Sequence, residues 1–295
     1  MKRVKVFAAL ALVAGLAVAP ERAVAQAEIG AQLDLFSAYV WRGLSLTNKP
    51  VLQPDVWVSF PAGNASITVG GWSSIDIGRY DDLEDDISES GAISSFNYAE
   101  FDPYAEVAFP VGKSTLTFGA TAYIYPNDGD SPDIANDFGL LTTDANTVEL
   151  YGKAGFDVLL SPEVSVYYDV DKIKGAYIEA AGSHDLPLSE KVALSLGALV
   201  GFSAGQGISD DPDESSNFDD DGLTHLDFSA GLPLTAGVFE ITPVLHLVVG
   251  VDDRVKVTSP TNTSDVKLWG GVSIGWSRTL GEAPEEEAEE ATEAE

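Results

Sequence analysis

The sequence predicts an all-β protein, a transmembrane antiparallel up-and-down β-barrel of about twelve strands. Apolar and polar residues alternate within each segment, which gives every strand two faces in contact with different media. The connections between segments are alternately short and long, as in outer-membrane barrels. The segments are mostly about 10 to 16 residues long, against roughly 5 to 6 in ordinary strands and about 9 to 11 in tilted membrane strands.

A soluble β-sandwich is the alternative, because its strands also alternate. Sandwich loops, however, do not follow a regular short and long order. Closing the strands into a barrel also gives every backbone N–H and C=O a partner in hydrocarbon. We therefore expect the outer membrane of a Gram-negative bacterium as the location, with both termini on the periplasmic side.

The N-terminus has the features of a cleaved secretory signal peptide, residues 1–25. Lys2, Arg3 and Lys5 form a basic start, an apolar run follows over residues 6–19, and residues 23–25 form a small-residue cleavage site. The apolar run is short for a membrane-spanning helix, which needs roughly 20 residues, although an N-terminal anchor helix is the alternative. The barrel is then expected over residues 26–280.

Composition excludes several functions. The formal net charge of −31 argues against nucleic acid as a partner, because phosphates would be repelled. The chain has no cysteine, which excludes thiol catalysis and a lipoprotein anchor. No cofactor is indicated.

The first predicted strand, residues 28–43, places Leu33 and Leu35 on the lipid side and Asp34 and Arg42 on the inner side. Trp41, near its end, is expected in an interfacial aromatic girdle. The remaining predicted strands cover residues 51–60, 65–78, 97–109, 114–125, 146–160, 164–171, 176–186, 191–203, 223–234, 238–251 and 265–280.

The predicted tight turns contain mostly Pro, Gly or Ser, the usual turn formers. They fall at residues 61–64, 110–113, 161–163, 187–190 and 235–237. The long loops, expected outside the cell, are residues 79–96, 126–145, 204–222 and 252–264, with short members on the same side at 44–50 and 172–175.

The inner face predicted by this alternation is strongly acidic, and three basic residues, Arg42, Lys153 and Lys267, oppose the carboxylates. Carboxylates in a low-dielectric wall attract cations and repel anions, which favours a cation-preferring pore. The alternative is that they hydrate the lumen or pair with bases in a plugged barrel. The predicted inward carboxylates are Asp34, Asp55, Asp76, Glu100, Asp102, Glu106, Glu149, Asp157, Asp169, Glu179, Asp227 and Glu240.

The long loops are also acidic, with runs such as residues 81–82, 85–86, 210–211, 213–214 and 219–221. Carboxylates bind Ca²⁺ or Mg²⁺, but no segment matches an EF-hand, so solvated loops or divalent bridges to lipopolysaccharide are the favoured interpretation. His225 and His246 share an inward face, yet no Gly-x-Ser-x-Gly motif accompanies them. We therefore expect that the protein is not an enzyme.

The C-terminus has two parts. Residues 269–276 resemble the terminal-strand signal read by the barrel assembly machinery, in which glycine precedes alternating hydrophobic residues. Residues 281–295 follow as a Glu/Ala-rich tract, which is expected to be disordered. This tail departs from the usual terminal aromatic residue and leaves the signal internal.

Two short motifs carry a family resemblance. The first runs from Ser37 through Tyr39, Trp41, Arg42 and Gly43 to Ser45, with Pro50 and Gln53 beyond it, and the second is residues 71–74, Gly-Trp-Ser-Ser. Together they resemble the first and third strands of the TorF family of porin-like proteins, also labelled Gcw_chp. The resemblance implies an outer-membrane barrel concerned with transport. From the residues alone, Arg42 is expected to pair with Asp34 or Asp55 in the lumen, or to be a structural residue at the barrel rim.

Taken together, these features predict a monomeric channel for passive diffusion of ions or small hydrophilic solutes. Its surroundings would be outer-membrane lipid and lipopolysaccharide. The alternative is a non-conducting structural or adhesive barrel that presents acidic loops.

Overall fold

A computed structural model describes residues 27–77, 96–126, 146–189, 192–208, 215–256 and 265–280. The predicted signal peptide and acidic tail lie outside these ranges. So do most of the predicted loops 79–96 and 126–145, and the acidic runs at residues 81–82, 85–86, 210–211 and 213–214.

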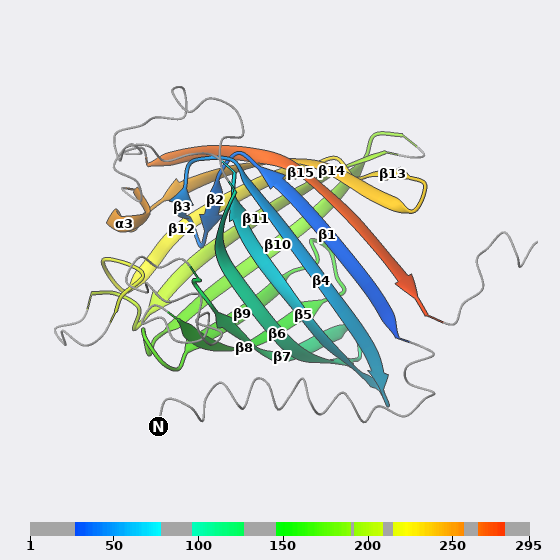
Figure 1. Cartoon of the computed structure of the whole chain (residues 1–295), viewed down its shortest axis with the longest axis horizontal. Helices are drawn as coiled ribbons and strands as arrows, with labels where there is room; N and C mark the ends of the chain where they lie inside the picture. The colour runs from blue at the N-terminus through cyan, green and yellow to red at the C-terminus, as the bar shows by residue number, and fades with distance from the viewer. Residues whose placement is uncertain are drawn as a thin grey trace, which may run out of the picture.

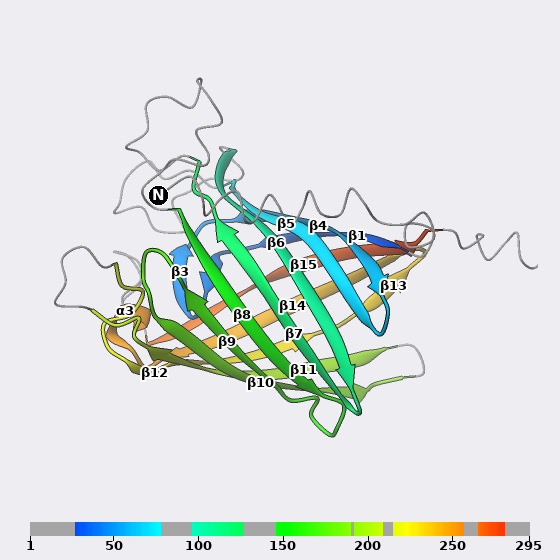
Figure 2. The ribbon, with the colours of Figure 1, turned by 90° about the horizontal axis from the view of Figure 1, so that it is seen from below.

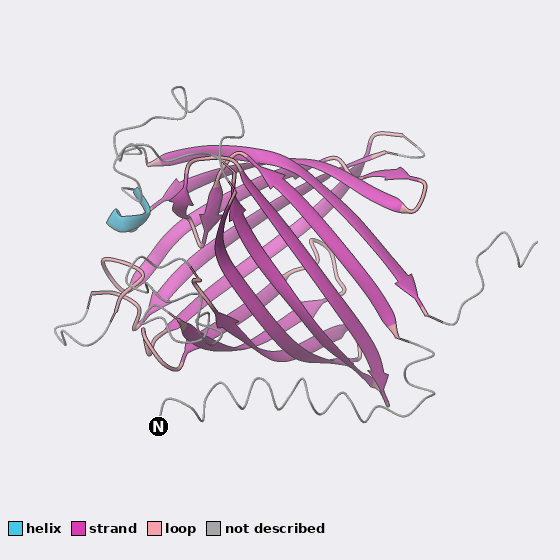
Figure 3. Cartoon of the chain, viewed as in Figure 1, coloured by secondary structure: helices cyan, strands magenta, loops and turns pink. Residues whose placement is uncertain are grey.

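The predicted twelve-stranded antiparallel barrel is confirmed (Figures 1 and 3). Each strand pairs with its neighbours in the chain, and β1 closes the barrel by pairing with both β4 and β15. The short β13 continues β12, because both pair with β14. The barrel strands are β1 (Glu28–Phe36), β4 (Val51–Ala62), β5 (Ala65–Asp76), β6 (Asn97–Val111), β7 (Ser114–Tyr123), β8 (Thr147–Phe156), β9 (Glu163–Asp169), β10 (Ala176–Pro187), β11 (Ala193–Ala204), β12 (Gly222–Gly231) with β13 (Leu234–Ala236), β14 (Phe239–Gly250) and β15 (Val266–Thr279).

The alternation in the sequence matches the two faces of the wall. In β1, Leu33 and Leu35 are 39% and 48% exposed, whereas Asp34 between them is 7% exposed. Large apolar side chains are exposed in the same way along most of the barrel strands, which surrounds the barrel with an apolar belt. Aromatic rings on the inner face cover glycines of the next strand. The Trp57 ring occupies the space where Gly30 would carry a Cβ, and Tyr151 does the same at Gly119.

Both ends of the described chain lie at one end of the barrel, which we call the terminal rim. Glu28 pairs with Thr279, and the Leu280 N–H donates to the carbonyl of Ala27. The opposite end is called the loop rim. The predicted turns at residues 61–64, 110–113 and 235–237 join strands at the terminal rim, and the predicted hairpin at 172–175 joins β9 to β10 at the loop rim.

The structure corrects the first predicted strand, which ends at Phe36 and not at residue 43. The next residues form a separate two-stranded hairpin of β2 (Tyr39–Trp41) and β3 (Leu44–Thr47), with no pairing to the barrel wall. Arg42 and Gly43 make its turn with φ angles of 51° and 81°. A strand cannot continue through two residues in the left-handed region, so the chain reverses there.

A second correction concerns the predicted strand 146–160. β8 ends at Phe156, and residues 157–162 form an irregular connection in which Leu160 and Ser161 have φ angles of 70° and 38°. Beyond the sheet, α3 (Asp253–Lys256) follows β14 as a single helical turn. Within the described ranges, no helix has both the length and the apolar character required to cross a membrane.

A candidate functional site in the barrel lumen

The β2–β3 hairpin folds into the barrel at the loop rim (Figures 1 and 2). Leu44 of the hairpin is buried in a cluster with Tyr177, Phe218 and Val255. The connection between β1 and β4, which the sequence placed in a short external loop, therefore occupies the lumen instead.

Arg42, at the turn of the hairpin, forms a buried ion pair with Glu149 of β8. Its two terminal nitrogens donate to the two carboxylate oxygens at 2.8 and 2.7 Å. The two side chains are only 6% and 2% exposed. This two-pronged geometry is the strongest arrangement available to an arginine and a carboxylate. The predicted partners, Asp34 and Asp55, were wrong, because the hairpin carries Arg42 away from the strands beside β1.

Aromatic rings surround the Arg42 guanidinium. Its central carbon lies 4.3 Å from the ring centre of Trp41, 4.8 Å from that of Tyr167 and 4.4 Å from that of Tyr177. Rings at such distances attract a cation through their negative faces. The prediction that Trp41 belongs to a lipid-facing girdle was wrong, since its ring packs edge-on against Tyr123 in the lumen, with 6.0 Å between ring centres.

Two further contacts hold the hairpin turn. The Lys267 ammonium of β15 donates to the Gly43 carbonyl at 3.0 Å. The His225 ring of β12 lies against Gly43, so that a Cβ there would be 2.6 Å from its Cγ. Gly43 is therefore required both by its positive φ and by the close approach of this ring.

The two motifs that carry the family resemblance meet inside the barrel. Tyr39 of the first motif packs on Trp72 of the second, with 5.4 Å between ring centres. The Gln53 side chain donates to the Ser74 hydroxyl at 3.4 Å. The hairpin and its contacts on β4 and β5 thus bring together residues that lie well apart in the sequence.

Tyrosines satisfy several carboxylates of the inner wall, and among the described residues only one of these carboxylates, Glu149, also pairs with a basic residue. A tyrosine hydroxyl donates a hydrogen bond without neutralising the charge it contacts, so these pairs leave the wall negative. This role of the tyrosines was not predicted from the sequence, although they lie at the same alternate, inward-facing positions as the acids. The pairs are Tyr104 with Asp55 at 3.2 Å, Tyr123 with Glu149 at 2.8 Å, Tyr151 with Glu106 at 2.8 Å and Tyr167 with Glu179 at 3.1 Å.

Other predicted lumen residues have different local roles. Asp169 is buried and accepts from the Thr147 hydroxyl and from the N–H groups of residues 171–173, so it fixes the turn between β9 and β10. Both Asp34 oxygens accept from the Gln32 side chain at 3.0 Å. The Lys153 ammonium lies 4.9 Å from the ring centre of Tyr151.

The predicted acids of β5 and β6 gather near the loop rim. Asp76 ends β5, and Glu100 and Asp102 are buried on β6. One oxygen of Asp102 is buried with no hydrogen-bond partner among the described residues. Among all the described residues of the chain, no group of three or more histidine or acidic side chains has the arrangement of a metal site.

Two predicted lumen carboxylates are exposed at the edge of the barrel. Asp157 follows the end of β8 and is exposed, because the strand stops earlier than its alternation suggested. Glu240 keeps the inward alternation of β14, but it lies in the terminal hairpin with β13 and is also exposed.

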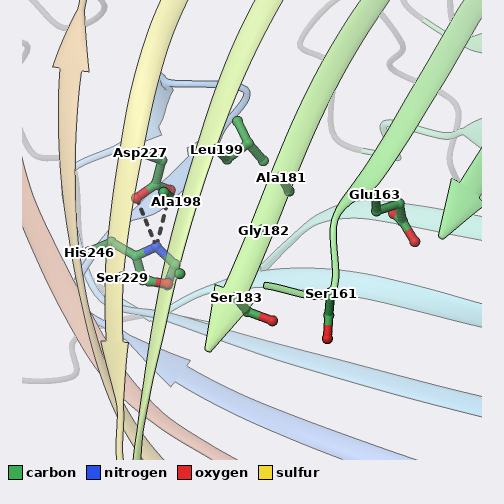
Figure 4. Close-up of a pocket in the computed structure, with 11 residues that line it drawn as sticks. Ser161, Glu163, Ala181, Gly182, Ser183, Ala198, Leu199, Asp227, Ser229 and His246 are labelled. Carbon is green, nitrogen blue, oxygen red and sulfur yellow. Dashed lines mark hydrogen bonds and ion pairs between the residues drawn. The ribbon is translucent and has the colours of Figure 1, made fainter. Parts of the chain in front are cut away.

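Two cavities lie along the inner wall, and one of them adjoins the hairpin. The first, about 340 Å³, is lined by Arg42, Tyr177 and Glu179 among others. The second, about 320 Å³, is lined by serines and by His246. Asp227 and Leu199 line both, and Nδ1 of His246 lies 3.1 Å from the Asp227 carboxylate (Figure 4).

A closed barrel with an apolar outer belt and a charged, hydrogen-bonded interior defines an outer-membrane β-barrel protein, and the chain is embedded in the lipid of that membrane. More particularly, it belongs to the bacterial protein family of unknown function called Gcw_chp, whose match covers residues 21–243. The Gcw_chp resemblance is thereby confirmed. A search of curated proteins finds no match.

Several solved structures are similar at low sequence identity. LpxR from Salmonella typhimurium is 9% identical, with a TM-score of 0.45, over 84% of this chain and 99% of its own. An outer membrane channel from Pseudomonas putida F1 is 12% identical, with a TM-score of 0.45, over 89% and 99%. OmpF of Salmonella typhi, in complex with daunomycin, is 8% identical, with a TM-score of 0.34, over 85% and 97%.

The comparison with LpxR corrects one expectation. The sequence predicted that the protein is not an enzyme; LpxR, to which it is similar, is an outer-membrane enzyme, and the prediction is withdrawn.

Proposed function

We propose that the protein is a channel for passive diffusion of ions or small hydrophilic solutes, with a preference for cations. The observation that supports this most directly is the charge beside the lumen cavities. Asp227 lines both cavities and Glu179 lines the larger one, and the charge of Arg42 is already matched by Glu149. Unmatched carboxylates in a low-dielectric wall concentrate cations and repel anions.

The hairpin limits the size of the solutes that can pass through the lumen. A twelve-stranded barrel is wider than an eight-stranded one, whose interior side chains can fill completely. Here, β2 and β3 fill part of that width at the loop rim, and the cavity beside them and the one that follows it along the wall have the dimensions of small solutes. Passive flux through such a space needs no cofactor.

A second candidate function is a non-conducting structural or adhesive barrel. The observation that favours it is the same hairpin, because Arg42, Gly43 and Leu44 each make a buried contact that holds it in the lumen. In this case the acidic loops would be the functional surface.

A planar-bilayer recording separates the two candidates. The protein without residues 1–25 is refolded in detergent and inserted into a bilayer with a tenfold KCl gradient. We expect a steady conductance and a reversal potential shifted from zero towards the equilibrium potential of potassium. This shift should be smaller in the double variant Glu179→Gln/Asp227→Asn. A reversal potential shifted towards the equilibrium potential of chloride would overturn the cation preference. Absence of conductance from a folded barrel would favour the structural or adhesive function.

We further propose that the protein is a monomer, inserted by the barrel assembly machinery through the signal at residues 269–276 in β15, and that its acidic loops contact lipopolysaccharide. The β15 strand pairs with both β1 and β14, so it closes the barrel and is the last of the described strands. Light scattering in detergent should give the mass of one chain. A multiple of that mass would contradict the monomer.

A further inference from the structure

The two lumen cavities follow one strand, β11. Its inward residues are small on both sides of Leu199: Gly197 lies towards the terminal rim and Gly201 towards the loop rim. Side chains of the neighbouring strands fill the space that these glycines leave. The Ser229 hydroxyl lies against Gly197, and Tyr177 and His225 lie against Gly201.

The strand register places the cavities in sequence along the barrel. Glu179 and His225, which line the larger cavity, both pair with Gly201. Ser229, which lines the smaller cavity, pairs with Gly197. Leu199 and Asp227 pair with each other between these two levels, and both line both cavities, so they mark the junction.

The lining is acidic and rich in aromatic rings. Glu163, Glu179 and Asp227 contribute carboxylates, and Arg42 is the one lysine or arginine among the lining residues. Because Glu149 matches Arg42, the lining retains negative charge. Tyr177 adds a fully buried hydroxyl with no hydrogen-bond partner in the described part of the chain.

A side chain of the protein, Arg42, already shows that a guanidinium group can bind to the aromatic wall of the larger cavity. The Arg42 guanidinium lies 4.8 and 4.4 Å from the ring centres of Tyr167 and Tyr177, both on the wall of the larger cavity. A guanidinium is planar and weakly hydrated, so it stacks on rings and pairs with carboxylates at little cost. A second such group beside Arg42 would meet the partly exposed ring of Tyr167, with Glu179 and Asp227 as its partners.

We propose that the two cavities form one binding track for small organic cations of the guanidinium type, with Asp227 and Leu199 at their junction. This inference deepens the proposed channel function, because it names the class of solute and the path. Binding itself can nevertheless be measured without any flux.

The binding test uses butylguanidinium and its neutral isostere butylurea, titrated by calorimetry into the detergent-solubilised protein without residues 1–25. We expect heat of binding for the cation and at least tenfold weaker binding for the urea. Asp227→Asn and Glu179→Gln should each weaken cation binding at least tenfold. The matched controls Asp157→Asn and Glu240→Gln remove the same charges at exposed edge positions and should leave binding unchanged.

Equal binding of the two compounds, no binding, or an equal loss in the control variants would overturn the proposal. A gel shift between unboiled and boiled samples first establishes that each variant is folded. If Asp227→Asn does not fold, Glu179→Gln and its control Glu240→Gln carry the same test.

A bilayer recording then tests the path. Leu199→Ala should raise the conductance and Leu199→Trp should lower it, whereas Leu196→Ala, on the lipid side of the same strand, should change nothing. Binding of butylguanidinium without conductance would refute the channel and keep the site. Conductance without binding, or conductance insensitive to residue 199, would refute the track and keep the channel.

Discussion

Arg42 and Glu149 are separated by 107 residues in the chain, yet they form a buried ion pair with two hydrogen bonds of 2.8 and 2.7 Å. The pair joins the turn of an inner hairpin to the barrel wall at β8. Among the described residues the hairpin has no strand pairing to that wall, so side-chain contacts such as this ion pair hold it in the lumen.

Glu149→Gln should release the hairpin. The substitution leaves the Arg42 guanidinium buried without its counter-charge, and breaking a buried pair in this way costs about 3 to 5 kcal/mol. We expect a lower free energy of unfolding in urea and a larger single-channel conductance. Glu106→Gln is the matched control, because Glu106 accepts from Tyr151 without an ion pair. Its loss should be about 1 kcal/mol, as for a single hydrogen bond.

The double variant Arg42→Met/Glu149→Leu separates a missing charge from a missing contact. Two apolar side chains of similar size leave no uncompensated charge, and such replacements of buried pairs are often neutral or stabilising. The double variant should therefore recover most of the stability lost in Glu149→Gln. A double variant as unstable as the single one would show that the ion pair is not what holds the hairpin.

Gly43→Ala should destabilise the hairpin by two separate effects. The residue has a φ of 81°, and an added Cβ would lie 2.6 Å from the His225 ring. Gly63→Ala is the control, since Gly63 has a φ of 70° with open space around it. We expect Gly63→Ala to cost about 1 kcal/mol of unfolding free energy and Gly43→Ala at least about 1 kcal/mol more, from thermal or urea unfolding. Equal losses would mean that His225 moves aside freely.

The barrel itself could be predicted because its cause is local and repetitive. Each strand must separate lipid from a polar interior. The alternation of Leu33, Asp34 and Leu35 therefore already indicates which face of β1 contacts lipid and which contacts the lumen. The tight turns could be found for the same reason, because Pro, Gly and Ser mark them directly in the sequence.

The lumen hairpin could not be found in this way. Residues 37–43 continue the apolar and polar alternation of β1, and nothing local distinguishes a strand in the wall from a strand folded inwards. One signal was present: Arg42-Gly43 followed by a second short alternating segment fits a hairpin turn. The partner of Arg42 could not be predicted from the sequence, because Glu149 is one of many inward acids and only the closed topology places it opposite the hairpin.

The lipid-facing belt gives a fourth prediction. Leu33 and Gln32 are neighbours on β1, on the outer and inner faces respectively. Leu33→Arg should lower the free energy of unfolding of the vesicle-inserted barrel by about 2 to 4 kcal/mol, the cost of an arginine at the bilayer midplane. Gln32→Arg should be tolerated, because Asp34, which now accepts from Gln32, is available to pair with it. Equal effects in urea titrations of vesicle-inserted protein would contradict the assignment of the two faces.

Asp221 gives the connection between β11 and β12 a pH-dependent fold. Partial burial alone would raise its pKa, but hydrogen bonds from the Ser203 hydroxyl and the N–H groups of residues 205–207 hold the pKa below its usual value. A lowered folded-state pKa means that the stabilisation is complete above the ordinary aspartate value of about 3.9. It is lost as the pH falls through the lowered pKa of the folded protein.

Amide hydrogen exchange at Gly205 and Gln206 measures this dependence. Protection factors should be constant at neutral pH, fall at acidic pH in the wild-type protein, and be low at every pH in Asp221→Asn, because an amide oxygen is a weaker acceptor than a carboxylate. Asp220→Asn removes the same charge one residue earlier, where the N–H groups of residues 205–207 donate to Asp221 and not to Asp220, and should follow the wild-type curve. Protection that stays constant down to pH 2, or a shift of equal size in Asp220→Asn, would show that general loop charge and not the Asp221 hydrogen bonds orders this connection.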